Sequence, residues 1–102
     1  MNTLTNEEKE ILTVENQYWV DKAQALARLE ENKDFQSVIL EGYFRDKAVD
    51  GVSLLANDGI KQGGHRSDVM EDLIAISSLQ DFFITIRNLG YAAEDDLDEV
   101  ND

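Results

Sequence analysis

Residues 35–56 read FQSVILEGYFRDKAVDGVSLLA, and their apolar side chains recur at helical spacing. They fall on two adjacent helical faces: Phe35, Val38, Ile39, Gly42, Val49, Val52 and Ala56 on one, and Leu40, Tyr43, Phe44, Ala48, Gly51 and Leu55 on the other. This period predicts a helix from about Asp34, the expected N-cap, to Ala56. Because more than half of its circumference is apolar, we expect this helix to lie between other helices.

Two glycines interrupt this predicted helix. A glycine inside a helix costs about 1 kcal/mol relative to alanine. We therefore expect Gly42 and Gly51 to admit a close neighbour, such as Trp19 or a phenylalanine. The alternative interpretation is a kink.

A second helix is predicted upstream, from about Thr5 to Glu31. Thr5 and Glu8 have the spacing of a capping box. Leu12, Trp19 and Leu26 recur every seven residues and mark an amphipathic face. Residues 32–33 are predicted to form a short turn before the next helix.

A third helix is predicted downstream of a stop signal at residues 57–59, Asn-Asp-Gly. It should begin at Ser67 or Asp68, with Asp68 and Glu71 at capping-box spacing. Its apolar stripe includes Leu73, Ile76, Leu79, Phe83 and Ile86. Gly90 is interpreted as a left-handed C-cap, with Tyr91 folding back onto Ile86. The acidic residues that follow are predicted to form a tail or a frayed helix.

These segments predict an all-α fold. The expected arrangement is a three-helix antiparallel bundle, or a helical hairpin with a third packed helix, followed by an acidic C-terminal tail. Residues 1–93 should form a single helical domain and residues 94–102 the tail. The absence of proline fits a chain of few, long helices.

The composition limits the functions that the protein can have. The formal net charge is −13, from 22 acidic and 9 basic residues. Such a surface disfavours direct contact with nucleic acid or anionic lipid and favours basic protein partners. Cysteine is absent, which excludes disulfides and thiolate zinc sites. No apolar run reaches the roughly 18 residues of a membrane span, and the first residues do not resemble a signal peptide. These features predict a cytoplasmic protein.

The sequence contains no recognisable catalytic, cofactor-binding or metal-binding residues. His65 is the only histidine, so neither a di-iron site nor a histidine-based zinc site can be assembled. The loop around Lys61, His65 and Arg66 is locally basic and precedes a helix start, which makes it a candidate anion contact. It lacks the phosphate-loop pattern, however, and a plain flexible loop is the alternative interpretation.

Two adjacent aromatic pairs, Tyr43-Phe44 and Phe82-Phe83, do not fit a core alone. Neighbouring residues on a helix cannot point in the same direction, so one member of each pair must lean outward. We therefore interpret Tyr43, Phe44, Phe82 and Phe83 as a candidate protein interface, whereas core packing is the alternative.

The chain resembles small, mostly uncharacterised helical proteins of tailed bacteriophages over residues 19–93. The resemblance is carried by residues 25–35 (ALARLEENKDF), 38–44 (VILEGYF), 48–55 (AVDGVSLL), 75–83 (AISSLQDFF) and 89–90 (LG). It implies a phage setting, with the protein in the host cytoplasm or in a virion, and assigns no catalytic residues.

Three functions follow as hypotheses. The first is a non-enzymatic interaction module, a phage virion or assembly component that contacts capsid, portal or scaffold protein or itself, as a homo-oligomer or a subunit of a larger assembly. The second is an acidic inhibitor that mimics nucleic acid and binds a host enzyme. The third is a small anionic-ligand binder that uses the loop from Lys61 to Arg66.

Overall fold

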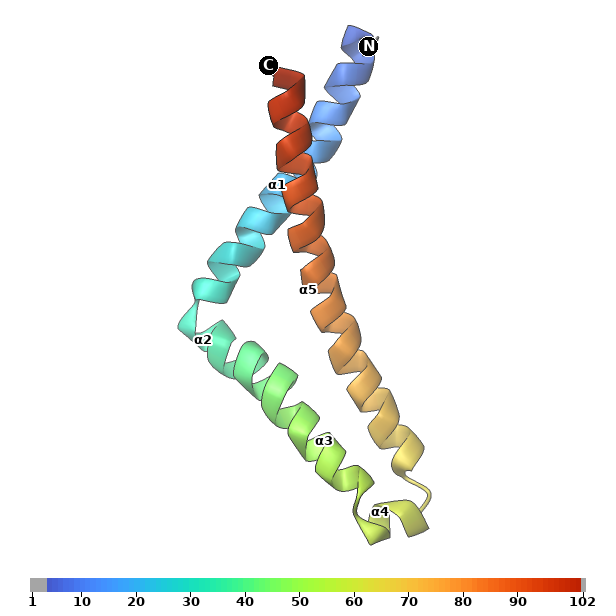
Figure 1. The fold of residues 1–102 in the computed structure, drawn as a ribbon. Coiled ribbons are helices and arrows are strands. Elements are labelled where there is room, and N and C mark those ends of the chain that lie inside the picture. The colour runs from blue at the N-terminus through green and yellow to red at the C-terminus, as the bar shows by residue number, and fades with distance from the viewer. Residues whose placement is uncertain (1–3, 102) are drawn as a thin grey trace. The chain divides into compact units, whose positions relative to one another are not determined.

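The structure, a computed structural model, describes residues 4–101. Its elements are α1 (Asn6–Glu31), α2 (Lys33–Phe35), η1 (Gln36–Asp46), α3 (Lys47–Leu55), α4 (Asp58–Gln62) and α5 (Arg66–Asn101), labelled in Figure 1 except for η1. All elements in this part of the chain are helical, which confirms the all-α class. The three-helix antiparallel bundle and the division into a domain and a tail stay predictions.

The predicted capping box begins α1. The Glu8 backbone N–H donates to Thr5 Oγ1 at 3.1 Å, and the Thr5 N–H donates to Glu8 Oε2 at 3.4 Å. The next N-cap was predicted at the wrong residue. The side chain of Asn32, not Asp34, accepts from the Phe35 N–H at 2.9 Å. Since Gln36 also donates to the Glu30 carbonyl at 2.7 Å, this turn caps both flanking helices.

A regular α-helix was predicted for this region. The helix from residue 33 to residue 55 instead departs from regular α-helical geometry. In η1 the backbone forms i→i+5 hydrogen bonds, and the Lys47 N–H still donates to the Gly42 carbonyl at its end. This widens each turn and changes which residues share a face. The buried face of α3 carries Gly51, with Ala48 and Leu55 half-buried. Val49 and Val52 are exposed, so the predicted burial of both apolar faces is wrong for this part of the helix.

The predicted end of the helix before the stop signal is confirmed, because α3 ends at Leu55, but the loop that follows contains the short helix α4. The side chain of Asn57 caps α4 by accepting from the Ile60 N–H at 3.1 Å. Helix α5 then begins at Arg66, which places Asp68 inside its first turn rather than at the predicted N-cap. Gly64, with φ of 75°, is the one positive-φ residue in the described chain, and it makes the turn before α5.

The predicted helix end at Gly90 is wrong. Helix α5 continues through Gly90 and the acidic residues that follow, as far as Asn101. Gly90 is buried and lies against Ala23 and the Trp19 carbonyl of α1. A close helix contact, and not a left-handed turn, therefore explains this glycine. The predicted return of Tyr91 onto Ile86 is also wrong, because Tyr91 is exposed on the continuing helix.

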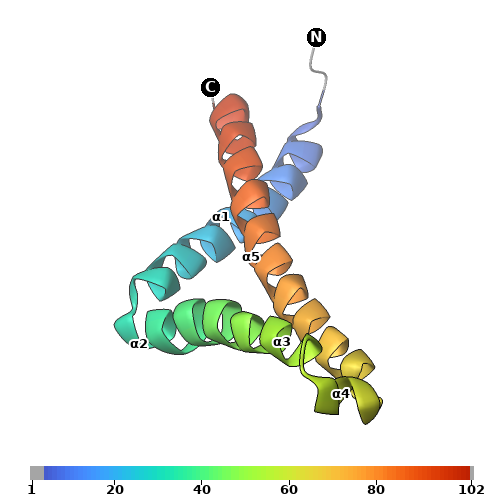
Figure 2. The same ribbon diagram turned by 60° about the horizontal axis from the view of Figure 1, so that its bottom comes forward.

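The described chain divides into two compact units. The first unit pairs α1 up to residue 28 with α5 from residue 83, and these parts cross in Figures 1 and 2. Its buried residues are Leu26, Ile86, Gly90 and Ala93. In the second unit, Leu29–Phe82, α4 joins α3 to the first part of α5 (Figure 1), and Gly51 of α3 lies against Leu73 of α5. Its buried residues are Gly51, Val69 and Ile76.

Candidate functional site

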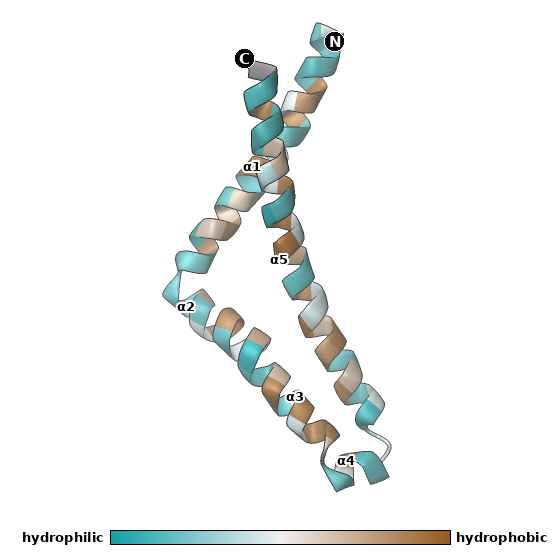
Figure 3. Ribbon diagram, viewed as in Figure 1, coloured by the Kyte–Doolittle hydropathy of each residue, from teal (hydrophilic) through white to brown (hydrophobic). Residues whose placement is uncertain are grey.

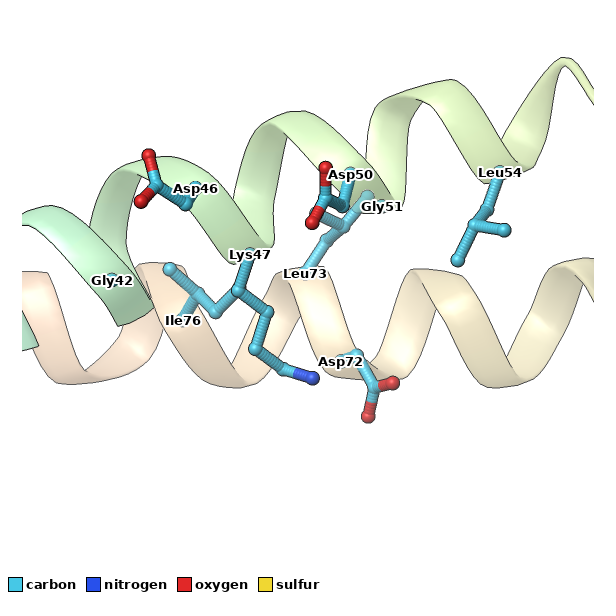
Figure 4. A pocket seen from close by; sticks show the side chains of 9 residues that line it. All are labelled: Gly42, Asp46, Lys47, Asp50, Gly51, Leu54, Asp72, Leu73 and Ile76. Atoms are coloured by element: carbon cyan, nitrogen blue, oxygen red, sulfur yellow. The ribbon is translucent and has the colours of Figure 1, made fainter. Parts of the chain in front are cut away.

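A groove of about 260 Å³ opens in the second unit between η1–α3 and the first part of α5 (Figure 4). Its lining comprises Gly42, Asp46, Lys47, Asp50, Gly51, Leu54, Asp72, Leu73 and Ile76. The floor is apolar, and the charged side chains stand at its rim. Sequence analysis singled out the two glycines but did not predict this groove.

Two glycines shape the groove for different local reasons. A Cβ atom on Gly51 would lie 2.9 Å from Leu73 Cδ2 of α5, so glycine allows the two helices to approach. This confirms the predicted close neighbour, although the neighbour is a leucine. A Cβ atom on Gly42 would lie 3.0 Å from the Ser37 carbonyl oxygen, five residues back in η1. The wide turn and the missing side chain together leave space beside Asp46 and Lys47.

The rim of the groove is mainly acidic. Asp46 and Asp50 come from η1 and α3, Asp72 comes from α5, and the Lys47 amino group extends toward Asp72 in Figure 4. Asp46 already accepts a hydrogen bond from Arg45 Nε at 3.1 Å, in a solvent-exposed pair. An apolar floor below carboxylates suits a lysine or arginine side chain, which has an apolar stem and a charged end. No group of residues suited to holding a metal ion occurs in the described part of the chain.

The predicted aromatic interface is distributed over both units. Tyr43, Phe44 and Phe82 belong to the second unit, and Phe83 belongs to the first. The rings of Tyr43 and Phe44 lie together in η1, with centroids 5.9 Å apart and planes tilted by 55°. Phe82 is exposed, whereas Phe83 is half-buried, which fits the expectation that one member of that pair leans outward. Their role as an interface stays a prediction.

The basic loop has partners within the chain. Arg66 Nε donates to the Leu55 carbonyl at 3.2 Å and so closes the end of α3. His65 Nδ1 lies 3.5 Å from Asp68 Oδ2, and the His65 ring sits where a side chain on Gly63 would be. Lys61 is exposed in the last turn of α4. These contacts show two of the three residues in structural roles, and anion binding there stays a prediction.

More large apolar side chains are exposed than the sequence pattern predicts. In the described residues, fourteen large apolar side chains are exposed, whereas five apolar residues are buried. Figure 3 shows apolar residues on every long helix, while the last turns of α5 are mostly polar. The exposed set includes Ile11, Val14 and Tyr18 on α1 and Val49 and Val52 on α3. Contiguous exposed apolar patches mark sites of protein–protein contact, whereas single exposed apolar residues are ordinary.

Comparison with known proteins finds no match to a family model, to a curated protein or to a solved structure. Among the described residues, no helix combines the length and apolar character required to cross a membrane.

Proposed function

We propose that this chain is a non-enzymatic protein–protein interaction module. The excess of exposed over buried large apolar side chains carries the proposal. Fully burying a side chain of this size gains about 1.5–3 kcal/mol. These side chains are 37–71% exposed, so each gains a corresponding fraction when a partner covers it, and a partner that covers several of them gains free energy from all. Of the four aromatic residues in the predicted interface, Phe82 belongs to this exposed set, and the half-buried Tyr43, Phe44 and Phe83 would complete the contact in the proposal.

We further propose that the partner is a structural protein of a bacteriophage, or a second copy of the chain within a larger assembly. The resemblance of residues 19–93 to small helical phage proteins supports this setting. Capsid, portal and scaffold proteins are the candidate partners, in the host cytoplasm or in the virion.

Co-purification from infected cells tests this proposal. An affinity-tagged chain should retain a phage structural protein through washing, and the chain should be detected in virions or assembly intermediates. Replacing Phe82 by serine should reduce the retained partner by about tenfold, because one buried aromatic anchor contributes roughly 1.4 kcal/mol or more.

The control variant is Asn88→Ser, which changes an exposed polar side chain of α5 outside the exposed apolar set. It should retain the partner at the wild-type level, and both variants should keep the wild-type helical content by circular dichroism. Absence of the chain from virions and from every assembly intermediate would contradict the phage-assembly proposal.

A second candidate function is the acidic inhibitor that mimics nucleic acid. The observation that favours it is the helical presentation of Glu94, Asp95, Asp96, Asp98 and Glu99 in α5. With a rise of about 1.5 Å per residue, these five carboxylates are spaced at roughly the one charge per 1.7 Å of duplex DNA.

This alternative predicts binding to a basic nucleic-acid groove on a host enzyme. Binding should weaken steeply between low and moderate salt and should be lost when the five carboxylates are replaced by their amides. Retention of full affinity by that amide variant would exclude the alternative.

A further inference from the structure

An apolar stripe runs along one exposed face of α1 in the first unit. Ile11, Val14 and Tyr18 are 55%, 71% and 53% exposed. Their i, i+3, i+7 spacing places them on one face of the helix. This stripe is distinct from the buried face of α1, which carries Leu26 and the half-buried Trp19 and Ala23. We call these three residues the Ile11–Tyr18 face.

Carboxylates surround the N-terminal half of this face. Glu7, Glu10 and Glu15 line a shallow hollow together with Ile11 and Val14, and the hollow encloses about 490 Å³. By helical position, Glu10 flanks one side of the stripe, Glu15 flanks the other, and Glu7 lies at its start. All three are exposed, and none has a basic side chain within ion-pair distance in the described chain.

A lysine lies at the other end of the face. The Lys22 amino group lies 5.3 Å from the centre of the Tyr18 ring, which positions a cation against that ring. Tyr18 also packs edge-on against Trp19, with ring centroids 5.0 Å apart. The face is therefore mainly acidic: the three glutamates surround its first half, and Asp21 stands beside Lys22 at its other end.

We propose that the Ile11–Tyr18 face binds an amphipathic helix of another protein whose apolar stripe is flanked by lysine or arginine residues. The apolar stripe would cover Ile11, Val14 and Tyr18, and the basic residues would lie over Glu10 and Glu15 and avoid Lys22. Helices that dock in this way present anchors at i, i+3 and i+7 spacing. This inference rests on the proposed interaction function and specifies the chemistry of one partner.

Charge argues against a second copy of the chain on this face. In a parallel pair of Ile11–Tyr18 faces, Glu10 and Glu15 of one copy would lie close to the same carboxylates of the other. An antiparallel pair would bring Lys22 toward Glu7 but would still place two mainly acidic faces together. Like charges at close range oppose association, and each chain carries a net charge of −13. A basic helix converts the same carboxylates into favourable contacts.

The test uses the full chain and a synthetic helical peptide of about 20 residues, long enough to form a helix on binding. The peptide carries leucines at i, i+3 and i+7 flanked by lysines. A control peptide has the same composition with the leucines distributed around the helix. Binding is measured by fluorescence anisotropy at low and at physiological salt. The patterned peptide should bind at least about tenfold more tightly than the control, because only it presents a continuous apolar stripe.

Paired variants locate the binding surface. Ile11→Ser/Val14→Ser should weaken binding of the patterned peptide by about tenfold or more, since two apolar contacts are lost. The matched control is Val49→Ser/Val52→Ser on α3, whose side chains are 59% and 61% exposed. It should change the affinity by less than about twofold. Glu10→Gln/Glu15→Gln should weaken binding at low salt and reduce its salt dependence.

Three results would overturn the inference: equal binding of the two peptides, an equal loss in the α3 control, or a wild-type dimer that Ile11→Ser/Val14→Ser converts to monomer. The last result would assign the face to a second copy. Since the co-purification experiment depends on a native partner and not on this peptide, a failure here leaves that experiment unaffected. Likewise, a failure of co-purification would leave the result of the peptide experiment unaffected.

Discussion

Gly90 in the first unit faces Ala23 Cβ and the backbone carbonyl of Trp19, whereas Gly51 in the second unit faces the side chain of Leu73. Both residues are buried where one helix approaches another. At Gly90 the neighbouring atoms belong to the backbone or are fixed to it. At Gly51 they belong to a leucine that can change rotamer. Two glycines with similar burial should therefore differ in how strongly they resist a side chain.

The larger effect is expected for Gly90→Ala. The added methyl group would overlap Ala23 and force α1 and α5 apart, which costs typically 1–3 kcal/mol and more where the backbone must move. Alanine recovers about 1 kcal/mol of helix propensity. We expect a net loss of about 2 kcal/mol in the free energy of unfolding, measured by urea denaturation.

The second variant Ala23→Gly isolates the contact. In the Gly90→Ala background it removes the overlapping methyl group, so the double variant should recover more than half of the loss after correction for the single Ala23→Gly effect. Additive effects of the two substitutions would show that Gly90 does not act through Ala23.

A smaller effect is expected for Gly51→Ala. Leu73 Cδ2 lies at the end of a flexible side chain and can move by a few tenths of an ångström. The packing cost and the gain in helix propensity are then similar, and the free energy of unfolding should change by no more than about 1 kcal/mol. The same urea experiment measures it. A loss equal to that of Gly90→Ala would refute the distinction between the two crossings.

The sequence predicted one capping box and several core positions correctly, whereas the cap predictions at Asp34, Asp68 and Gly90 were wrong. The Thr5–Glu8 capping box forms as expected because both partners lie within one turn. Leu26, Ile76 and Ile86 were placed on apolar stripes and are buried. In each case the deciding interaction is short-range or follows directly from helical periodicity.

Gly90 could not be assigned from local signals alone. Glycine fits a left-handed cap and a close helix contact equally well, and the choice depends on a residue 67 positions away, Ala23. The signal that would have found it is the continued spacing of Ile86, Gly90, Ala93 and Leu97, at four, three and four residues. That pattern extends the apolar face of α5 beyond the glycine.

The groove in the second unit was missed for another reason. Its hollow depends on the wide turns of η1, and the predicted regular helix gives a different set of faces. The exposed stripes were underestimated because periodicity identifies apolar faces without showing whether the chain itself covers them. The three-residue Ile11–Tyr18 face lies beside the predicted core stripe of α1.

The smallest expected effect concerns the charges at one end of the first unit, where α1 begins and α5 ends. Removing a carboxylate should change the free energy of unfolding in opposite directions at these two helix termini. Glu94 and Glu99 lie in the last turns of α5, near the negative end of its dipole, and each has an aspartate four residues away, Asp98 or Asp95. Glu94→Gln/Glu99→Gln should therefore raise the free energy of unfolding by about 0.5 kcal/mol at low salt. Glu7→Gln, at the positive end of α1, should lower it by about 0.3 kcal/mol.

Ionic strength distinguishes this electrostatic origin from a change in helix propensity. Glutamate and glutamine have similar propensities, so both effects should fade as salt screens the exposed charges within about 8 Å at physiological ionic strength. Urea midpoints at two salt concentrations measure the change. If the α5 variant were less stable than the wild type at low salt, the carboxylates of α5 would have to be making favourable contacts within the chain, and their availability to a basic partner would be correspondingly reduced.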